Sequence, residues 1–301
     1  MHSYYMIGLM LNRGRRDSLI CIILLTFFSC IAYDCHAKKV KMKCVTLNLR
    51  YDNKGDGVNR WDNRKEGVFQ FMKDEDADII CFQEVLNRQL KDLDVSQDLY
   101  AHVGVGRDDG KTRGEYAPIF YKKEKYEKLE DGTFWLSEHP DSAGSVGWDA
   151  SLPRIATWVK LKDKKKNKVF MVVNTHFDHI GKKARLQSAE MIKRWVSEKS
   201  ANLPVILTGD LNVTEKSEAY KSLTDEHSLL VDTYKVAKKR KGVDYSFHNF
   251  GRKNVTDRSK IDFIFVSTGI KVKECVIPQE ELVNGVYLSD HNPVVSFFTM
   301  K

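Results

Sequence analysis

Hydrophobic and polar positions after residue 38 alternate in segments that predict strands and helices in turn. In the segment 40–49, the side chains of Val40 and Met42 fall on one face and those of Val45 and Leu47 on the other. Side chains that alternate between two faces at a period of two are typical of a β-strand. We therefore expect the domain to begin with a strand.

The same reading predicts further elements along the rest of the chain. They are a helix carrying Trp61, Val68, Phe69 and Met72, a strand Asp78–Phe82, a hairpin of Ile155–Leu161 and Lys168–Asn174 with a basic tip, a helix carrying Ala189, Ile192, Trp195 and Val196, and strands Val205–Thr208, Ile261–Val266 and Val294–Phe298. Strands and helices are intermixed to the end, and no Pro/Gly/Ser-rich linker separates them. The pattern predicts a single α/β domain of packed sheets and flanking helices over residues 38–301.

The first 37 residues have the pattern of an export leader. Three arginines within residues 13–16 precede the apolar run Leu19–Ala32, and a polar stretch then ends at Ala37. A basic region, a short apolar run and a small residue predict a signal peptide over 1–37, and the run is too short for a transmembrane span. We expect an exported protein, periplasmic or secreted; the alternative is a lipoprotein anchored through Cys30.

Composition limits the function classes only coarsely. The 301 residues are 42% hydrophobic and 30% charged, which excludes disorder and a disulfide-dense miniature scaffold. A net charge of +8 indicates an acidic partner, and the runs Lys162–Lys168 and Lys235–Lys241 either track a nucleic-acid backbone or are solvated loop tips. Cys44, Cys81 and Cys275 lack C-x-x-C spacing, so we expect buried free thiols without a zinc site.

Polar side chains that can do chemistry follow the ends of the predicted strands. They are Asn48, Gln83, Glu84, Asn174, His176, Asp178, Asp210, Asn212, Asp262, Asp290 and His291. Each one alone has an ordinary interpretation as a helix cap, an Asx turn or a hydrogen-bonded spacer. Together they offer oxygen ligands for a hard cation such as Mg²⁺ and histidines for acid–base chemistry near neutral pH.

This ordered set resembles the endonuclease/exonuclease/phosphatase superfamily, with Asn48, Gln83-Glu84, Asn174-Thr175-His176, Gly209-Asp210-Leu211-Asn212, Asp262 and Ser289-Asp290-His291 in sequence. The match runs from about Lys39 to Lys301. Within the superfamily, the sequence is similar to an exported bacterial branch and has some likeness to nocturnin-like deadenylases. The resemblance implies a four-layer α/β sandwich, in which two central, mostly antiparallel sheets are flanked by helices, as in deoxyribonuclease I.

The resemblance also implies a metal site. Glu84 would be the principal Mg²⁺ ligand, with Asn48 and Asp290 beside it as ligands or as supports. Mn²⁺ would be a substitute, because both ions take oxygen ligands in octahedral geometry.

Five residues would carry the catalytic steps by the same resemblance. Asp210 and Asn212 would orient the attacking water and the phosphate, and His176 would stabilise the transition state or protonate the leaving oxygen. His291 would be the general base, or a phosphate contact polarised by Asp262. Asp210 and His291 both remain candidates for the base at this point.

Four further residues are candidates for substrate binding. Arg154 at a strand start would clamp a phosphate, and Trp148 would stack on a base or sugar; the alternatives are a surface ion pair and a core aromatic. Asp178 and His179 either face the substrate or only pack in their loop.

The sequence therefore predicts a monomeric, Mg²⁺-dependent phosphoester hydrolase that uses in-line attack of water on phosphorus. A phosphodiesterase or nuclease is the first reading, with nucleic acid as a candidate partner. The alternative is a phosphomonoesterase for a sugar, inositol or lipid head-group phosphate. A third reading is a binding module without catalysis, because a fold does not guarantee a function.

Overall fold

The computed structural model describes residues 39–96 and 98–300. The predicted leader 1–37 and its Cys30 lie outside the described residues. Within the described ranges, no helix combines the length and the apolar character needed to cross a bilayer.

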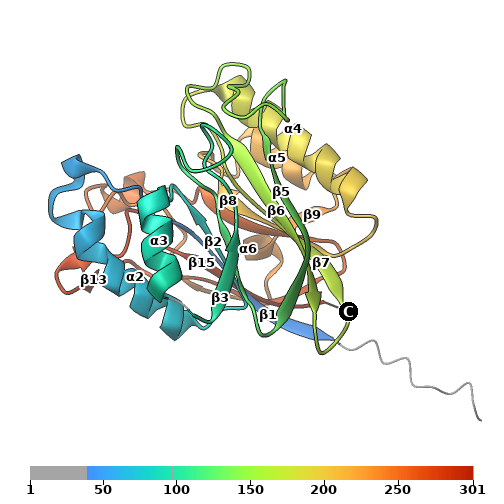
Figure 1. Cartoon of the computed structure of the whole chain (residues 1–301), viewed down its shortest axis with the longest axis horizontal. Coiled ribbons are helices and arrows are strands. Elements are labelled where there is room, and N and C mark those ends of the chain that lie inside the picture. The colour runs from blue at the N-terminus through green and yellow to red at the C-terminus, as the bar shows by residue number, and fades with distance from the viewer. Residues whose placement is uncertain (1–38, 97, 301) are drawn as a thin grey trace, which may run out of the picture. The chain divides into compact units, whose positions relative to one another are not determined.

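Two large mixed sheets form the centre of the domain (Figure 1). The first has the strand order β10 (Lys239–Gly242), β12 (Lys271–Ile277), β15 (Val294–Met300), β1 (Val40–Asn48), β2 (Ile79–Gln83), β4 (Ile119–Lys122) and β3 (Tyr100–Val103). The second has the order β5 (Tyr126–Trp135), β6 (Ile155–Asp163), β7 (Val169–His176), β8 (Val205–Asp210), β11 (Asp262–Ser267) and β9 (Leu230–Asp232). A small hairpin pairs β13 (Leu282–Val283) with β14 (Val286–Tyr287). The neighbours β1–β2, β7–β8 and β10–β12 are parallel, and the other pairs are antiparallel.

Helices cover the outer face of each sheet, so the domain is the predicted four-layer α/β sandwich. The first sheet packs against α2 (Trp61–Glu75) and α3 (Asn87–Ser96), and the second against α4 (Lys182–Lys199) and α5 (Glu218–Thr224). Shorter helical turns are η1 (Lys54–Asn59), α6 (Thr233–Val236) and η2 (Val255–Asp257).

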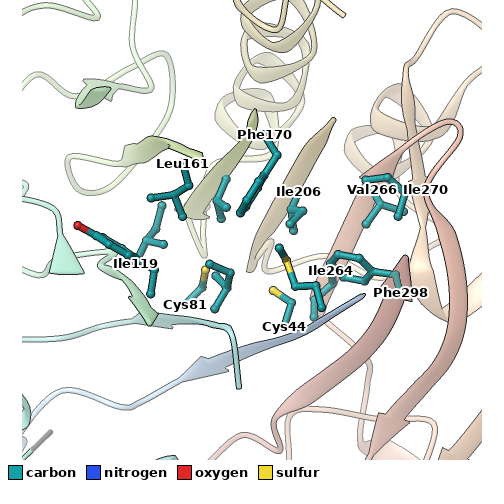
Figure 2. Close-up of a cluster of buried hydrophobic side chains, with 14 of the residues drawn as sticks. Cys44, Cys81, Ile119, Leu161, Phe170, Ile206, Ile264, Val266, Ile270 and Phe298 are labelled. Atoms are coloured by element: carbon teal, nitrogen blue, oxygen red, sulfur yellow. The ribbon is translucent and has the colours of Figure 1, made fainter. Parts of the chain in front are cut away.

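A hydrophobic core fills the space between the two sheets. Figure 2 shows Cys44 and Cys81 of the first sheet pointing toward Phe170, Ile206 and Ile264 of the second. The alternate residues of β1 belong to the core beneath the helices, so the two faces predicted for this strand are confirmed. The three cysteines of the described region are buried and free, as expected.

A buried arginine ties together the loops that lead to the strand ends. The guanidinium of Arg64, which is 1% exposed, donates to the carbonyl oxygens of Asn59 (2.6 Å), Leu49 (2.9 Å), Leu288 (2.7 Å) and Arg50 (3.0 Å). Burial lowers the pKa of Arg64 to about 10, which still leaves the side chain charged at neutral pH. One side chain of α2 therefore holds both the loop after β1 and the segment before β15.

Replacing Arg64 with methionine is expected to destabilise the chain by about 3 kcal/mol, because two buried and two partly buried carbonyl oxygens lose their donor. Urea unfolding followed by circular dichroism measures the change. The control is Arg194→Met, which removes a positive charge from the exposed face of α4. Equal unfolding midpoints for the two variants would contradict this role for Arg64.

Candidate active site

The site lies at one edge of the sandwich, where the ends of both sheets meet. In the first sheet, Asn48 at the end of β1 is in register with Gln83 at the end of β2, and Glu84 follows directly. In the second, His176 of β7 is in register with Asp210 of β8. The packed sheets bring the two groups into contact, since Asn48 Nδ2 lies 2.9 Å from Asp210 Oδ2.

Asn48 joins two carboxylates. Its Nδ2 donates to Glu84 Oε1 at 3.0 Å as well as to Asp210, while its Oδ1 accepts from the backbone N–H of Arg50 at 2.9 Å. Reversing the amide would place its oxygen against two carboxylates, which is unfavourable. Asn48 is therefore held as a donor that orients Glu84 and Asp210, and its oxygen is committed to the backbone.

Glu84 has a left-handed backbone conformation, with φ at 59°, and so does Arg50. This conformation costs a residue with a Cβ roughly 1–2 kcal/mol, so the surrounding contacts must impose it. The Glu84 carboxylate accepts from the backbone N–H of Tyr51 at 3.2 Å and lies 3.8 Å from Arg50 Nη1. These contacts hold Glu84 in the lining of the site cavity.

Arg50 was missed by the sequence analysis, although it comes two residues after Asn48. Its guanidinium binds both carboxylate oxygens of Asp56 at 3.0 Å and lies 3.9 Å from Asp290. Burial lowers the pKa of Arg50, but Asp56, Asp290 and Glu84 outweigh burial and raise it. Arg50 therefore places a fixed positive charge between Glu84 and Asp290.

His291 and Asp262 form a buried hydrogen-bonded pair. His291 Nδ1 lies 2.8 Å from Asp262 Oδ2, and His291 Nε2 faces Asp210 Oδ2 at 3.8 Å. Burial lowers the pKa of His291, but the carboxylates of Asp262, Asp290 and Asp210 outweigh it and raise the pKa to about 10. The imidazole is therefore a cation at neutral pH.

Asp210 occupies the centre of the site. Burial and the nearby Asp262 raise its pKa to about 7, against the lowering effects of His291, Asn48 and the backbone N–H of Asn212. A carboxylate whose pKa is near neutrality can accept a proton during a reaction at that pH.

A hydrogen bond from Asn212 determines which ring nitrogen of His176 carries the proton. Asn212 Nδ2 lies 3.0 Å from His176 Nε2 and donates to the carbonyl oxygen of Phe177 at 3.0 Å. An amide nitrogen only donates, so His176 Nε2 accepts and the ring proton sits on Nδ1, 3.8 Å from Glu115 Oε2. Burial, with help from Arg154, lowers the pKa of His176 well below its usual value, so the ring is neutral.

Arg154, Asp178 and His179 form one connected group. Arg154 Nε lies 3.2 Å from Asp178 Oδ2, and Arg154 Nη2 lies 3.0 Å from His179 Nδ1. Asp178 is 1% exposed, and it accepts from the hydroxyl of Ser151 and from the backbone N–H of Gly181. Arg154 and His179 line the site cavity, whereas Asp178 lies behind them and holds Arg154 in place.

Trp148 lies outside the cavity. Its backbone N–H donates to Glu138 at 3.1 Å, and its φ of 53° follows Gly147, which packs against the backbone of Leu136 and Ser137. This turn is fixed on the end of β5, so the structure does not bring Trp148 to the predicted substrate contact.

The side chains surround a cavity of about 440 Å³. Its lining residues are Arg50, Tyr51, Glu84, Glu115, Leu152, Arg154, His176, His179, Asp210, Asn212, Phe247, Ile261, Asp290 and His291. Sequence reasoning did not place Arg50, Glu115, Leu152, Phe247 or Ile261 there. Phe247 reaches the site through isolated bridges with Ser259 and His291, a pairing that has no local sequence signal.

The donor set fits a hard divalent cation. Glu84 and Asp290 offer carboxylate oxygens around Arg50, and ligand atoms of Asp210, Asp262 and His291 lie within 4.8 Å of one another. The described residues that line the cavity include no cysteine or methionine, so their ligand atoms are oxygen and nitrogen. The nitrogen of His291 that faces Asp262 is already engaged, so Glu84 and Asp290 are the better ligand pair.

The chain belongs to the Endonuclease/Exonuclease/phosphatase family, whose model matches residues 45–291. Members of this family are hydrolases that act on phosphoester bonds and typically depend on a metal ion. The predicted family and fold are therefore confirmed.

Solved structures add individual relatives. A family member from Bacteroides vulgatus is 50% identical, with a TM-score of 0.84 over 87% of this chain and 100% of that one. A mannosyl-6-phosphatase from Bacteroides thetaiotaomicron is 37% identical, with a TM-score of 0.80 over 85% of this chain and 99% of that one. The human nocturnin catalytic domain shares the fold at 17% identity, with a TM-score of 0.67 over 86% of this chain and 96% of that one.

Proposed function

We propose that the chain is a Mg²⁺-dependent phosphomonoesterase that acts on a sugar phosphate. The observation that carries this proposal is the charge of the cavity. Its lining contains two arginines and four carboxylates, and no lysine among the described residues that form it. A polynucleotide-binding cleft needs several basic side chains along the phosphate backbone, whereas a small phosphoester needs only one or two.

The size of the cavity and one relative support the same substrate class. A volume of about 440 Å³ is within the range for small-molecule sites. The relative that is 37% identical over nearly all of its length is a mannosyl-6-phosphatase. These points favour the phosphomonoesterase reading over the nuclease reading of the sequence.

In the proposed mechanism, Glu84 and Asp290 would hold the Mg²⁺ ion, and Arg50 would limit the repulsion between their charges. The ion would supply positive charge to the phosphoryl oxygens. Arg154, with His179 against it, would bind the phosphate from the opposite wall. Asn48 would keep Glu84 correctly oriented, as a donor rather than as a ligand.

Proton transfer would belong to Asp210 and His291. Asp210, whose pKa is raised to about 7, would take the proton of the attacking water as the bond between phosphorus and the sugar oxygen breaks. The leaving sugar oxygen would take its proton from solvent water that enters the cavity. His291, kept cationic by Asp262, would donate from Nε2 to a phosphoryl oxygen and stabilise the charge that develops there. His176 would act as a neutral acceptor that positions Asn212.

The test is the substrate preference of the purified chain. Phosphate release from mannose 6-phosphate should exceed hydrolysis of bis-p-nitrophenyl phosphate and of single-stranded DNA by at least about a hundredfold in kcat/KM, the scale of one lost charged contact. EDTA should abolish the activity, and Mg²⁺ or Mn²⁺ should restore it. A preference for either diester would instead support the nuclease reading.

A further inference from the structure

A group of lysines gathers at the end of the sandwich opposite the active site. Two neighbouring hollows of about 510 and 260 Å³ share Lys41, and the lysines that line them are Lys39, Lys41, Lys43, Lys125, Lys165, Lys166 and Lys273. We call these seven residues the basic pole. It joins the start of β1 to the turn between β6 and β7, both of which lie at the same end of the domain in Figure 1.

Most of this charge is not neutralised. Lys43 and Lys125 pair with Glu75 and Asp78, whereas within residues 39–96 and 98–300 the other five lysines have no carboxylate within ion-pairing distance. Asp163 is 3% exposed and turns inward to accept from the backbone N–H groups of the β6–β7 turn. Glu124 is the exposed acidic residue of the larger hollow. The outer surface of the pole is therefore strongly positive.

The basic pole cannot guide a substrate into the cavity. Lys41 is near the start of β1 and Asn48 is at its end, so the two are about 23 Å apart at the rise of a strand. A basic path for a nucleic-acid substrate would continue into the cleft, and the cavity lining contains no lysine among the described residues. The pole therefore fits a partner that leaves the active site free.

We propose that the basic pole docks on an anionic phospholipid bilayer. The N-terminal segment joins the domain at Lys39, inside the pole, so any attachment of that segment to a membrane would hold this face toward the lipid. Only eight residues separate Cys30 from Lys39, which is at most about 30 Å of extended chain. Docked in this way, the catalytic cavity faces away from the membrane.

The experiment uses the chain from residue 38 onward, so that the leader cannot cause binding. Residues 39–300 form a compact unit with their own cores. Sedimentation with phosphatidylcholine vesicles that contain about one third phosphatidylglycerol measures partitioning, and pure phosphatidylcholine is the neutral reference. Binding is expected only to the anionic vesicles and should be lost at high salt.

The variant carries Lys39→Gln, Lys41→Gln, Lys165→Gln and Lys166→Gln. Each lysine near an anionic surface is worth about fivefold in partitioning, so binding should fall by several hundredfold. The control removes four exposed lysines elsewhere, namely K54Q, K91Q, K199Q and K216Q. Equal losses in both variants, or equal binding to neutral vesicles, would overturn the proposal.

Two further measurements distinguish lipid docking from a loss of folding and from binding to a soluble polyanion. Both variants should keep the wild-type urea-unfolding midpoint and the wild-type turnover of a soluble phosphoester, because the pole is remote from the site. If the pole variant bound heparin or DNA more weakly while its vesicle binding stayed unchanged, the partner would be a polyanion and the membrane proposal would be wrong.

Discussion

Replacing Asp210 with asparagine is expected to lower kcat by about 10³-fold while the chain stays folded. Side chains from both sheets and from the segment before β15 surround the Asp210 carboxylate, because polar atoms of Asn48, His176 and His291 all lie within 3.8 Å of its Oδ2. A proton acceptor with a pKa near 7 would become an amide that cannot take a proton. The proposed attack by water would then lose its base.

Stability should change little in this variant. The amide oxygen can still accept one of the two hydrogen bonds that Asp210 receives from Asn48 and Asn212. The lost bond is offset because a carboxylate that is 1% exposed no longer has to be buried with its charge. Urea unfolding checks this, and single-turnover kinetics at saturating substrate measures the chemical step.

The control is Asp141→Asn, which changes an exposed aspartate in the same way. It should leave kcat and stability unaltered. Wild-type turnover in a folded Asp210→Asn chain would remove Asp210 from the role of base and would leave His291 as the candidate.

Strand periodicity made much of the fold predictable. The alternation along 40–49 indicated the strand β1, and the polar residues that follow the predicted strands indicated which side chains could do chemistry. Those polar residues divide into two sets in the structure. Gln83 Nε2 donates to Asn174 Oδ1 at 2.7 Å, and Asn174 donates to the carbonyl oxygens of Phe82 and Pro118, so this set fastens the sheets together.

The adjacent residues, Glu84 and His176, line the cavity instead. Sequence spacing alone cannot separate the two sets, because the distinction depends on which face of each strand meets the other sheet. The roles of Arg50 and Phe247 were equally inaccessible, since both arise from contacts between segments that are far apart in the chain. Trp148 differs from Arg50 and Phe247, because the sequence made it a candidate for substrate binding and the structure places it outside the cavity, in the turn after β5.

Replacing Asp262 with asparagine is expected to make the activity sensitive to alkaline pH. Asp262 holds the pKa of His291 at about 10, so the imidazole of the wild-type chain stays cationic across the neutral range. Without that carboxylate, the pKa should fall toward the ordinary histidine value of about 6.5, because only Asp290 and Asp210 then oppose burial. At pH 8.5 only about one imidazole in a hundred would carry the proton.

The pH profile of kcat/KM, divided by that of the wild-type chain at each pH, measures this effect. The ratio should be about 10⁻² at pH 8.5 and should recover to within tenfold at pH 5.5, where the imidazole is charged again. The Asp141→Asn control should give a ratio near one throughout.

If His291 were the base, its neutral form would be the active one, and loss of Asp262 would raise relative activity at alkaline pH. A ratio that is low and independent of pH would mean that Asp262 only orients the ring. The direction of the profile therefore distinguishes an imidazolium that stabilises charge on the phosphate from an imidazole that takes the proton of water.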